Sequence, residues 1–327
     1  MTEPHFMLEN QSHARIVAMG VALVLAGAGG RANVASAQSD QVIHVGVSAF
    51  EAHGDVYYAQ DLGLFKRAGL NIEVQQYQGG SIVVAAIVSG ALQIGAGSPL
   101  PLASARSRGL PVVLIAPGYI YDAAAPSPID ALVVAANSQA RTGKDLNGKT
   151  IGVTGIRSVD HIAAFAWIDQ HGGDSSTVKV VEVPQSAMPD AVAEGRVDAA
   201  MIGDPALSAG IDSGKVRILG KAYDAISKRF FAAGWFSTES WAAKNPEIVR
   251  KFTAAINAAS TWAVRNPEQA ALVLQKYMKV TFSRAHEYHA RALDPALIQP
   301  LLDAALKYKF LDSMNANDLI WKGQPSQ

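Results

Sequence analysis

Short polar or glycine-containing segments follow several apolar runs of the chain, and they hold the side chains best suited to contact a ligand. In the first such segment Phe50 offers a ring face and His53 a hydrogen-bonding nitrogen. In the next two, Gly80 permits close approach of the backbone to a ligand, and Ser81 and Ser98 each offer a hydroxyl. The alternative interpretation is a packed phenylalanine and two plain helix caps.

The second half of the chain adds charged candidates. Arg157 could hold a carboxylate or sulfonate through its two-pronged guanidinium, and Ser158 could cap a helix or donate to the ligand. Asp204 could accept a hydrogen bond from an N–H, amine or hydroxyl of the ligand, or could instead hold Arg157 or a backbone amide. Trp235 could stack on a flat ligand or pack in the core or hinge.

These candidates follow runs typical of strands, which alternate with runs typical of helices. Such alternation predicts α/β units with parallel sheets, in which ligands bind beyond the carboxyl ends of the strands. Helix N-termini there supply unpaired N–H groups and a partial positive charge. The expected strands are 42–47, 71–76, 93–96, 112–116, 131–135, 151–153, 178–183, 199–202, 216–219 and 230–236. The expected helices are 55–68, 81–89, 102–107, 158–170, 188–194, 246–264, 267–277, 284–290 and 295–307, and the Pro-containing stretch 117–128 is expected to be a linker.

Composition limits the function classes. The 327 residues are 49% hydrophobic and 17% charged, which predicts a folded protein of two domains or one large unit. The 28 basic and 28 acidic residues balance, so no bulk field attracts nucleic acid. The absence of cysteine excludes thiolate metal sites and a cysteine nucleophile. Asp160 and His161 have no clustered partners, so we expect no metal, no cofactor and no catalytic residue.

The N-terminal sequence predicts export. The apolar run of residues 16–28 is shorter than the roughly 20 residues that a membrane span needs, but it is typical of a signal peptide. Ala35-Ser36-Ala37 then supplies an A-x-A cleavage site. We therefore expect residues 1–37 to be removed as a signal peptide and the mature protein to be soluble in the periplasm.

Several short motifs, taken in order, resemble the solute-binding proteins of ABC importers for nitrate, sulfonate, taurine and thiamin-pyrimidine compounds. Gly63-Leu64-Phe65 is followed by Gly69-Leu70, as in that family. The further matches are residues 89–95 (SGALQIG, with Gln93 in place of the usual Asp), 145–153 (DLNGKTIGV), 195–200 (GRVDAA) and Asp204-Pro205, where many members have Glu-Pro. Each motif is weak alone, but their order and spacing are specific.

The resemblance implies a two-lobed α/β periplasmic binding protein fold of type II, hinge-linked, with C-terminal helices. Lobe I would comprise residues 38–125 plus 232–327, and lobe II residues 126–231. The implied function is capture of a small organic anion, a sulfonate or carboxylate with or without an aromatic body, or of a zwitterion. The protein would deliver it to the transmembrane subunit of an ABC permease. We expect a monomer that is not an enzyme and binds no nucleic acid.

Two other functions occur on similar architectures. The family's relatives include a sulfinate desulfinase with a cysteine nucleophile and a pyrimidine synthase with a cysteine-rich motif, and the absence of cysteine here disfavours both. A ligand-presenting sensor protein remains an alternative. Tyr119, Tyr121 and Trp235 would suit an aromatic ligand, including a thiamin-precursor pyrimidine, so the sequence leaves the solute open.

Overall fold

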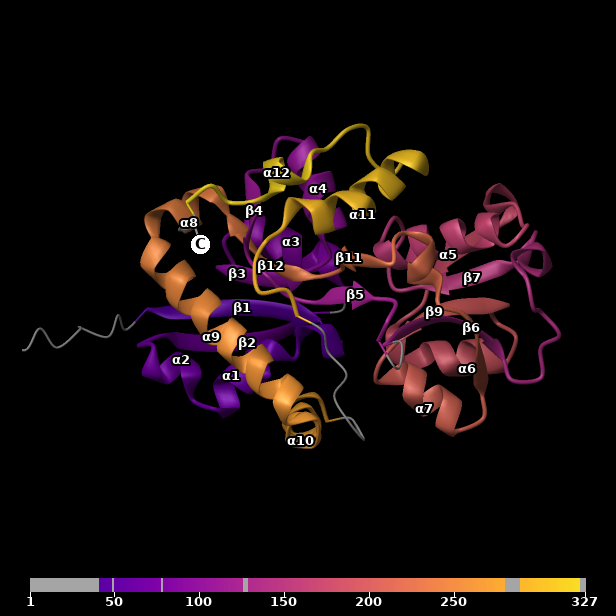
Figure 1. Ribbon diagram of the computed structural model, residues 1–327, viewed down its shortest axis with the longest axis horizontal. Helices are drawn as coiled ribbons and strands as arrows, with labels where there is room; N and C mark the ends of the chain where they lie inside the picture. The colour runs from indigo at the N-terminus through magenta and orange to yellow at the C-terminus, as the bar shows by residue number, and fades with distance from the viewer. Residues whose placement is uncertain (1–40, 49, 78, 126–128, 280–288, 324–327) are drawn as a thin grey trace, which may run out of the picture. The chain divides into compact units, whose positions relative to one another are not determined.

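The computed structural model describes residues 41–48, 50–77, 79–125, 129–279 and 289–323. All of them belong to one compact unit, Gln38–Gln327. Two five-stranded sheets and a two-stranded ribbon organise this unit (Figure 1). The predicted signal peptide lies outside the described residues.

The first sheet has the strand order β2-β1-β3-β12-β4. Its strands are β1 (Val42–Ser48), β2 (Asn71–Tyr77), β3 (Ile94–Gly97), β4 (Val112–Ala116) and β12 (Gly234–Thr238). The core strands of this sheet are almost continuously apolar because helices cover both faces. One face packs on α1 (Asp55–Asp61), α9 (Pro246–Arg265) and α10 (Pro267–Met278), and the other on α3 (Gly80–Val88) and α4 (Pro99–Ser107).

The second sheet has the order β10-β6-β9-β7-β8. Its strands are β6 (Asp130–Ala135), β7 (Thr150–Val153), β8 (Lys179–Glu182), β9 (Ala199–Gly203) and β10 (Val216–Gly220). One face packs on α5 (Val159–Gln170), and the other on α6 (Met188–Ala193) and α7 (Ala206–Asp212).

Each sheet is mixed, although the sequence favoured parallel sheets. β12 runs antiparallel to β3 and β4, and β6 runs antiparallel to β9 and β10. The reason is topological. After crossing from the other sheet, the chain enters each sheet at the carboxyl edge of the parallel strands, so its first strand there must run the opposite way.

The two crossings pair with each other as a ribbon. β5 (Ile120–Asp122) lies inside the expected linker and pairs antiparallel with β11 (Arg229–Phe231). The single strand expected at 230–236 is therefore two strands, β11 and β12. Residues 232 and 233 join β11 to β12. Their backbone N–H groups both donate to the carbonyl of Tyr119, and these hydrogen bonds hold the turn between the two strands.

Other differences from expectation are local. The helix expected at 55–68 is split into α1 and α2 (Leu64–Arg67), because Gly63 adopts a left-handed φ of 67°. The helix expected at 284–290 lies mostly outside the described residues. Short α8 (Glu239–Lys244) and α12 (Ala316–Leu319) were not expected.

The C-terminal helix α11 (Pro295–Lys307), drawn in yellow in Figure 1, packs on α4, on the ribbon strand β11 and on α5. It therefore contacts α4, which packs on the first sheet, and α5, which packs on the second. Among the described residues, no helix combines the length and the apolar character needed to cross a membrane.

Candidate functional site

The carboxyl edges of the two sheets meet at one backbone contact. The N–H of Glu51, in the loop after β1, donates to the carbonyl oxygen of Asp204, directly after β9, at 3.4 Å. Glu51 is only 1% exposed and Asp204 only 6%. Because ligands of α/β sheets bind beyond the carboxyl ends of strands, this junction is the candidate site.

The loop after β1 is held by a buried histidine. Nδ1 of His53 lies 3.2 Å from the backbone nitrogen and from the carbonyl oxygen of Ser48. Burial lowers the pKa of His53 to about 4, although the hydrogen bond with Ser48 acts in the other direction. The neutral ring packs edge-on to half-buried Phe50, with 6.2 Å between centroids. His53 therefore positions the loop, and Phe50 keeps accessible surface.

Two helix N-termini of the first sheet lie next to each other. Gly80 begins α3, exposed Ser81 follows it, and Ser98 caps α4 by accepting from the N–H of Leu100 at 3.3 Å. A Cβ built on Gly97 would lie 3.9 Å from the Cα of Gly80, so the end of β3 adjoins the start of α3. Both N-termini offer N–H groups to an anionic group.

The third helix N-terminus belongs to α5. Its cap is Ser158, whose hydroxyl accepts from the N–H of His161 at 3.4 Å. His161 is 7% exposed, and burial, followed by the nearby Arg157 guanidinium, lowers its pKa to about 4. Nδ1 of His161 accepts from the backbone N–H of Arg157 at 3.0 Å, whereas Nε2 is buried with no hydrogen-bond partner among the described residues.

The Arg157 side chain points to protein rather than to open space. Its Nη2 donates to the carbonyl oxygens of Lys309, at 3.1 Å, and Phe310, and its guanidinium lies 5.2 Å from the Phe310 ring centroid. These contacts tie the start of α5 to the segment after α11. The expected contact between Arg157 and an anionic ligand stays a prediction.

Two buried carboxyls line the second sheet's edge. Asp160 accepts hydrogen bonds from the hydroxyls of Thr154 at 2.7 Å and Tyr223 at 2.8 Å. Asp204 accepts from the N–H of Ser208 at 2.9 Å, through a side-chain oxygen. Asp204 thus holds the start of α7, which is one of the two roles expected for it.

A third carboxyl, that of Asp130, was missed by sequence reasoning. Asp130 begins β6 and is half-buried, and its carboxyl has no hydrogen bond or ion pair within the described part of the chain. Burial raises the pKa of Asp130 well above its usual range, and the carboxyls of Asp160 and Asp204 raise it further. The sequence favoured parallel strands, which would place the start of β6 at the opposite edge, and only the antiparallel entry of β6 brings Asp130 to the carboxyl edge.

These acids do not form a metal site. Within the described ranges, no three His, Asp or Glu side chains lie close enough together to hold a metal ion. What the three acids create instead is a group of carboxyls at the second sheet's edge, two of which, Asp130 and Asp160, have pKa values raised by burial. A ligand group with N–H donors or a positive charge would be stabilised there.

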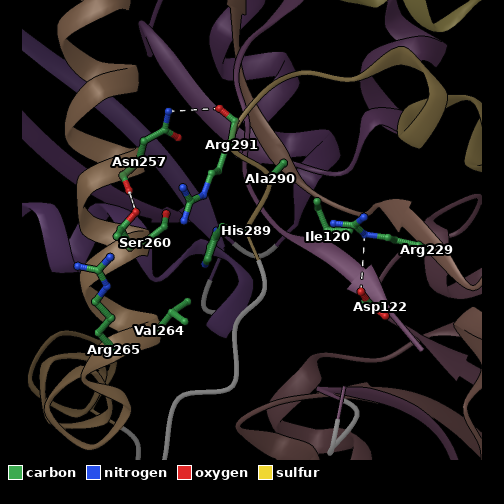
Figure 2. A pocket seen from close by; sticks show the side chains of 11 residues that line it. Ile120, Asp122, Arg229, Asn257, Ser260, Val264, Arg265, His289, Ala290 and Arg291 are labelled. Carbon is green, nitrogen blue, oxygen red and sulfur yellow. Dashed lines mark hydrogen bonds and ion pairs between the residues drawn. The ribbon is translucent and has the colours of Figure 1, made fainter. Parts of the chain in front are cut away.

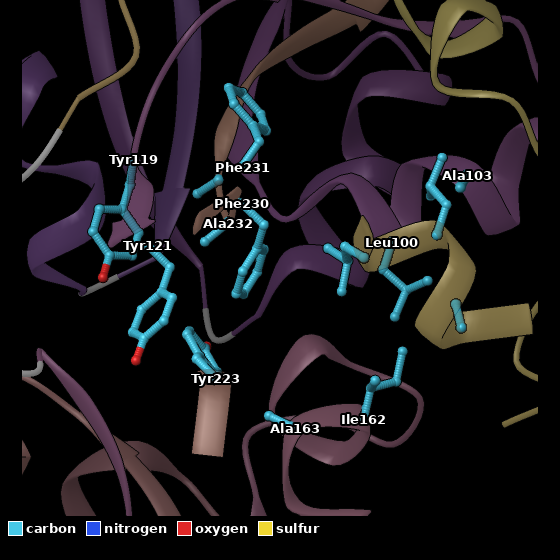
Figure 3. Close-up of a cluster of buried hydrophobic side chains, with 14 of the residues drawn as sticks. Leu100, Ala103, Tyr119, Tyr121, Ile162, Ala163, Tyr223, Phe230, Phe231 and Ala232 are labelled. Atoms are coloured by element: carbon cyan, nitrogen blue, oxygen red, sulfur yellow. The ribbon is translucent and has the colours of Figure 1, made fainter. Parts of the chain in front are cut away.

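Aromatic rings of the ribbon pack beside this edge. Tyr121 meets Tyr223 edge-on, with centroids 5.3 Å apart, and its hydroxyl donates to Asp224 at 2.5 Å (Figure 3). Trp235 lies elsewhere. It is 1% exposed and packs edge-on against Phe252 of α9, 5.2 Å between centroids, so we leave it out of the site.

Comparisons with known proteins agree on the family to which the sequence is similar. The NMT1/THI5-like family model matches residues 51–270. A binding protein of Brucella abortus is 27% identical over 224 residues, which cover 68% of this chain and 66% of that protein. The taurine-binding periplasmic protein of Escherichia coli is 28% identical over 195 residues, covering 59% and 58%. The matched segment thus spans no more than about two thirds of either relative's length.

Solved structures share the fold. The periplasmic aliphatic sulphonate-binding protein of Escherichia coli matches 87% of this chain and 98% of its own, with a TM-score of 0.70 and 21% identity. The periplasmic nitrate-binding protein of Synechocystis matches 85% and 84%, with a TM-score of 0.71 and 13% identity. The expected two-lobed periplasmic binding fold with C-terminal helices is confirmed. Since the family model covers more than half of the chain, the chain belongs to the NMT1/THI5-like family.

Proposed function

We propose that this chain is the solute-binding component of an ABC importer. It captures a small organic solute where the two carboxyl edges meet and presents it to the transmembrane subunit of the permease. The contact between Glu51 and Asp204 supports this, because a ligand held there would touch both lobes. The Escherichia coli relatives, which bind taurine and aliphatic sulphonates by name, support the same class of function.

The solute we propose is zwitterionic, with an acid group and an amine. The observation that carries this is the half-buried, unpaired carboxyl of Asp130 among other acids. Because its pKa is raised, Asp130 holds its proton in the free protein, and a cationic amine would bind by displacing that proton and pairing with the carboxylate. A sulfonate or carboxylate about 4 Å from the ionised form would be repelled by about 4 kcal/mol at an effective dielectric constant of 20. An amine in the same place would be attracted.

The acid group of the solute would then lie at the helix N-termini. Ser98 and Ser158 cap α4 and α5, and Gly80 begins α3 without a side-chain cap, so N–H groups remain to be shared with an anion. Phe50 would contact the solute body. His53 would act by holding the loop, since its Nδ1 is engaged with Ser48.

An aminopyrimidine is a second candidate. Its amino N–H groups would suit Asp130, and its ring would suit half-buried Phe50. The arrangement near Arg157 favours neither ligand, because the guanidinium is engaged with backbone carbonyls.

The proposed setting is the periplasm, reached after removal of residues 1–37, with the mature protein acting as a monomer that catalyses no reaction. The apolar run of residues 16–28 and the absence of cysteine support this. The relatives reported above are named as binding proteins, in agreement with a non-enzymatic role.

Calorimetry with matched solutes tests the proposal. Taurine, ethanesulfonate, ethylamine and an aminopyrimidine are titrated into the mature protein and into the Asp130→Asn variant. We expect taurine to bind more tightly than ethanesulfonate or ethylamine, and to lose affinity in the variant. If ethanesulfonate binds as tightly as taurine, the amine makes no contribution and the solute is a simple anion. If the solute is recovered chemically changed, the protein is an enzyme.

A further inference from the structure

We propose a second binding site, for a small multivalent oxyanion, in a cavity beside the ribbon. The cavity has a volume of about 240 Å³ and is lined by β5, β11, α9 and the segment 289–291 (Figure 2). Its cationic side chains are those of Arg229, Arg265 and Arg291. None of these arginines belongs to the site proposed for the solute.

The cavity lies on the opposite face of the ribbon from the tyrosines. Side chains alternate between the two faces of a strand, so Ile120 and Asp122 face one side and Tyr121 the other. Asp122 pairs in register with Arg229, and Tyr121 with Phe230. Ile120, Asp122 and Arg229 line the cavity, whereas Tyr121 and Phe230 pack with Tyr223 on the other face.

The charges in the cavity do not balance. Arg229 has one partner, Asp122, with 3.6 Å between Nε and Oδ2. The guanidinium groups of Arg265 and Arg291 have no ion-pair partner within the described part of the chain. His289 does not add to the positive charge available to a ligand, because its Nδ1 lies 2.9 Å from buried Asp55.

The arginines line the cavity from two sides. Figure 2 shows the guanidinium groups of Arg265 and Arg291 on the α9 side and that of Arg229 on the ribbon side, across the segment 289–291. All three side chains are exposed, and an anion in the cavity would accept charge-assisted hydrogen bonds from the guanidinium groups that it reaches. The neutral donors nearby are already in use, since Thr261 donates to the carbonyl of Asn257 at 2.8 Å.

Size narrows the ligand class. Pockets for ordinary small molecules measure about 300–1,000 Å³, and this cavity, at about 240 Å³, is smaller. Guanidinium forks match the paired oxygens of carboxylates and phosphates. The site therefore suits inorganic phosphate, a small phosphate ester or a short dicarboxylate, all of which offer two or more anionic oxygens.

The position of the cavity gives the anion a second effect. One wall is the ribbon through which the chain crosses between the sheets, and the other is α9, which packs on the first sheet. An anion that bridges the two walls would favour one arrangement of the ribbon and so change the affinity for the solute. By thermodynamic linkage, bound solute would change the affinity for the anion by the same factor. This coupling rests on the proposed function, whereas anion binding itself does not.

The test titrates inorganic phosphate and succinate into the mature protein at constant ionic strength. We expect saturable binding of one anion per chain, weakened at least tenfold by Arg265→Gln and by Arg229→Gln. Arg250→Gln is the matched control, because Arg250 lies on the same helix, is exposed, pairs with Glu247 and is outside the cavity. If Arg229→Gln fails to fold, Arg291→Gln replaces it.

Three results would overturn the site. The first is the absence of saturable binding of both anions. The second is an equal loss of binding in Arg250→Gln, which would show a non-specific charge effect. The third is unchanged phosphate binding in Arg265→Gln and Arg229→Gln, which would place the anion elsewhere, the solute site included. Retained phosphate binding in Asp130→Asn, together with lost taurine binding, separates the two proposals.

Discussion

Asp130 and Gly203 are partners in register across β6 and β9, and the carboxylate of Asp130 occupies the space that a Cβ on Gly203 would need. The carbonyl of Gly203 also accepts from Nε2 of Gln185 at 2.6 Å. The absence of a side chain at position 203 therefore lets an acid sit at the carboxyl edge, directly before Asp204.

The first prediction follows from this relationship. In Gly203→Ala the new methyl group displaces the Asp130 carboxylate, and we expect the Kd for the amine-bearing solute to rise about tenfold, equivalent to about 1.4 kcal/mol. Gly152→Ala is the control, because a Cβ on Gly152 in neighbouring β7 meets its nearest atoms at an ordinary 3.4 Å. Calorimetry and a thermal melt of both variants check it, and unchanged affinity in Gly203→Ala would remove Asp130 from the site.

The second prediction concerns pH. The raised pKa of Asp130 means that the free protein holds this proton well above the usual range of an aspartate. A cationic amine binds the ionised carboxylate, so its binding releases a proton, and affinity rises as the pH rises toward that raised pKa. Asp130→Asn should lose this slope. Titrations between pH 5 and 8 check it, and parallel profiles for the two proteins would refute it.

The Asp130 carboxyl also makes the stability of the protein depend on pH. The folded state binds the proton of Asp130 more tightly than the unfolded state does, so the bound proton stabilises the fold at low pH. That stabilisation is lost as the pH rises through the raised pKa. The variant Asp130→Asn should therefore gain stability relative to the wild type as the pH rises. Urea unfolding at several pH values measures this difference.

The third prediction concerns two buried histidines. Burial lowers the pKa of His53 and of His161 from 6.5 to about 4. The unfolded state therefore binds more protons between these values, and stability falls as the pH drops below about 6.5. Each histidine should cost about 2 kcal/mol between pH 7 and pH 5.

Replacement by asparagine tests that slope. In His53→Asn and His161→Asn the amide oxygen can take the place of Nδ1, and neither residue titrates. Each variant should lose its share of the acid sensitivity in urea unfolding at pH 7 and pH 5, and the double variant should lose both shares. A double variant as acid-sensitive as the wild type would show that other groups control the response.

The elements that local sequence specifies were predictable. β1, β4 and α11 begin and end within one residue of expectation, because their signals are apolar runs, caps and a proline at the first turn. Ser98 and Ser158 were expected to cap helices or meet ligand, and they do cap α4 and α5. Such features depend on residues close in sequence.

Features that depend on distant contacts were not predictable. β5 and β11 have three residues each and form a ribbon across a long sequence separation, so neither has a periodic signal of its own. The partners of Arg157 are backbone carbonyls after α11. Every residue type has a backbone carbonyl, so the sequence does not show which ones an arginine will contact. The pKa of Asp130 is raised first by burial and then by the carboxyls of Asp160 and Asp204, and only the fold produces that burial and brings those acids near.

The fourth prediction separates two aspartates on α1. Asp55 is fully buried, lies 2.9 Å from His289 and accepts from the hydroxyl of Ser260 at 2.8 Å. Asp55→Ala leaves a buried histidine and a hydroxyl without their acid, and should cost about 3 kcal/mol of unfolding free energy. Asp61→Ala, at the other end of α1, removes a partly exposed ion pair with Lys276 of α10 and should cost less than about 1 kcal/mol. Chemical denaturation measures both, and equal losses would contradict the buried pair's importance.

The fifth prediction distinguishes an aromatic residue that supports the core from one that meets the solute. Trp235 packs against Phe252 with almost no exposed surface, so Trp235→Phe should lower the free energy of unfolding by about 2 kcal/mol and leave the solute Kd unchanged. Phe50 is half-buried in the loop after β1, so Phe50→Ala should raise the Kd about tenfold and change stability by less than about 1 kcal/mol. Calorimetry and urea unfolding of both variants separate the roles. A loss of affinity in Trp235→Phe at unchanged stability would return the indole to the ligand contact that the sequence suggests.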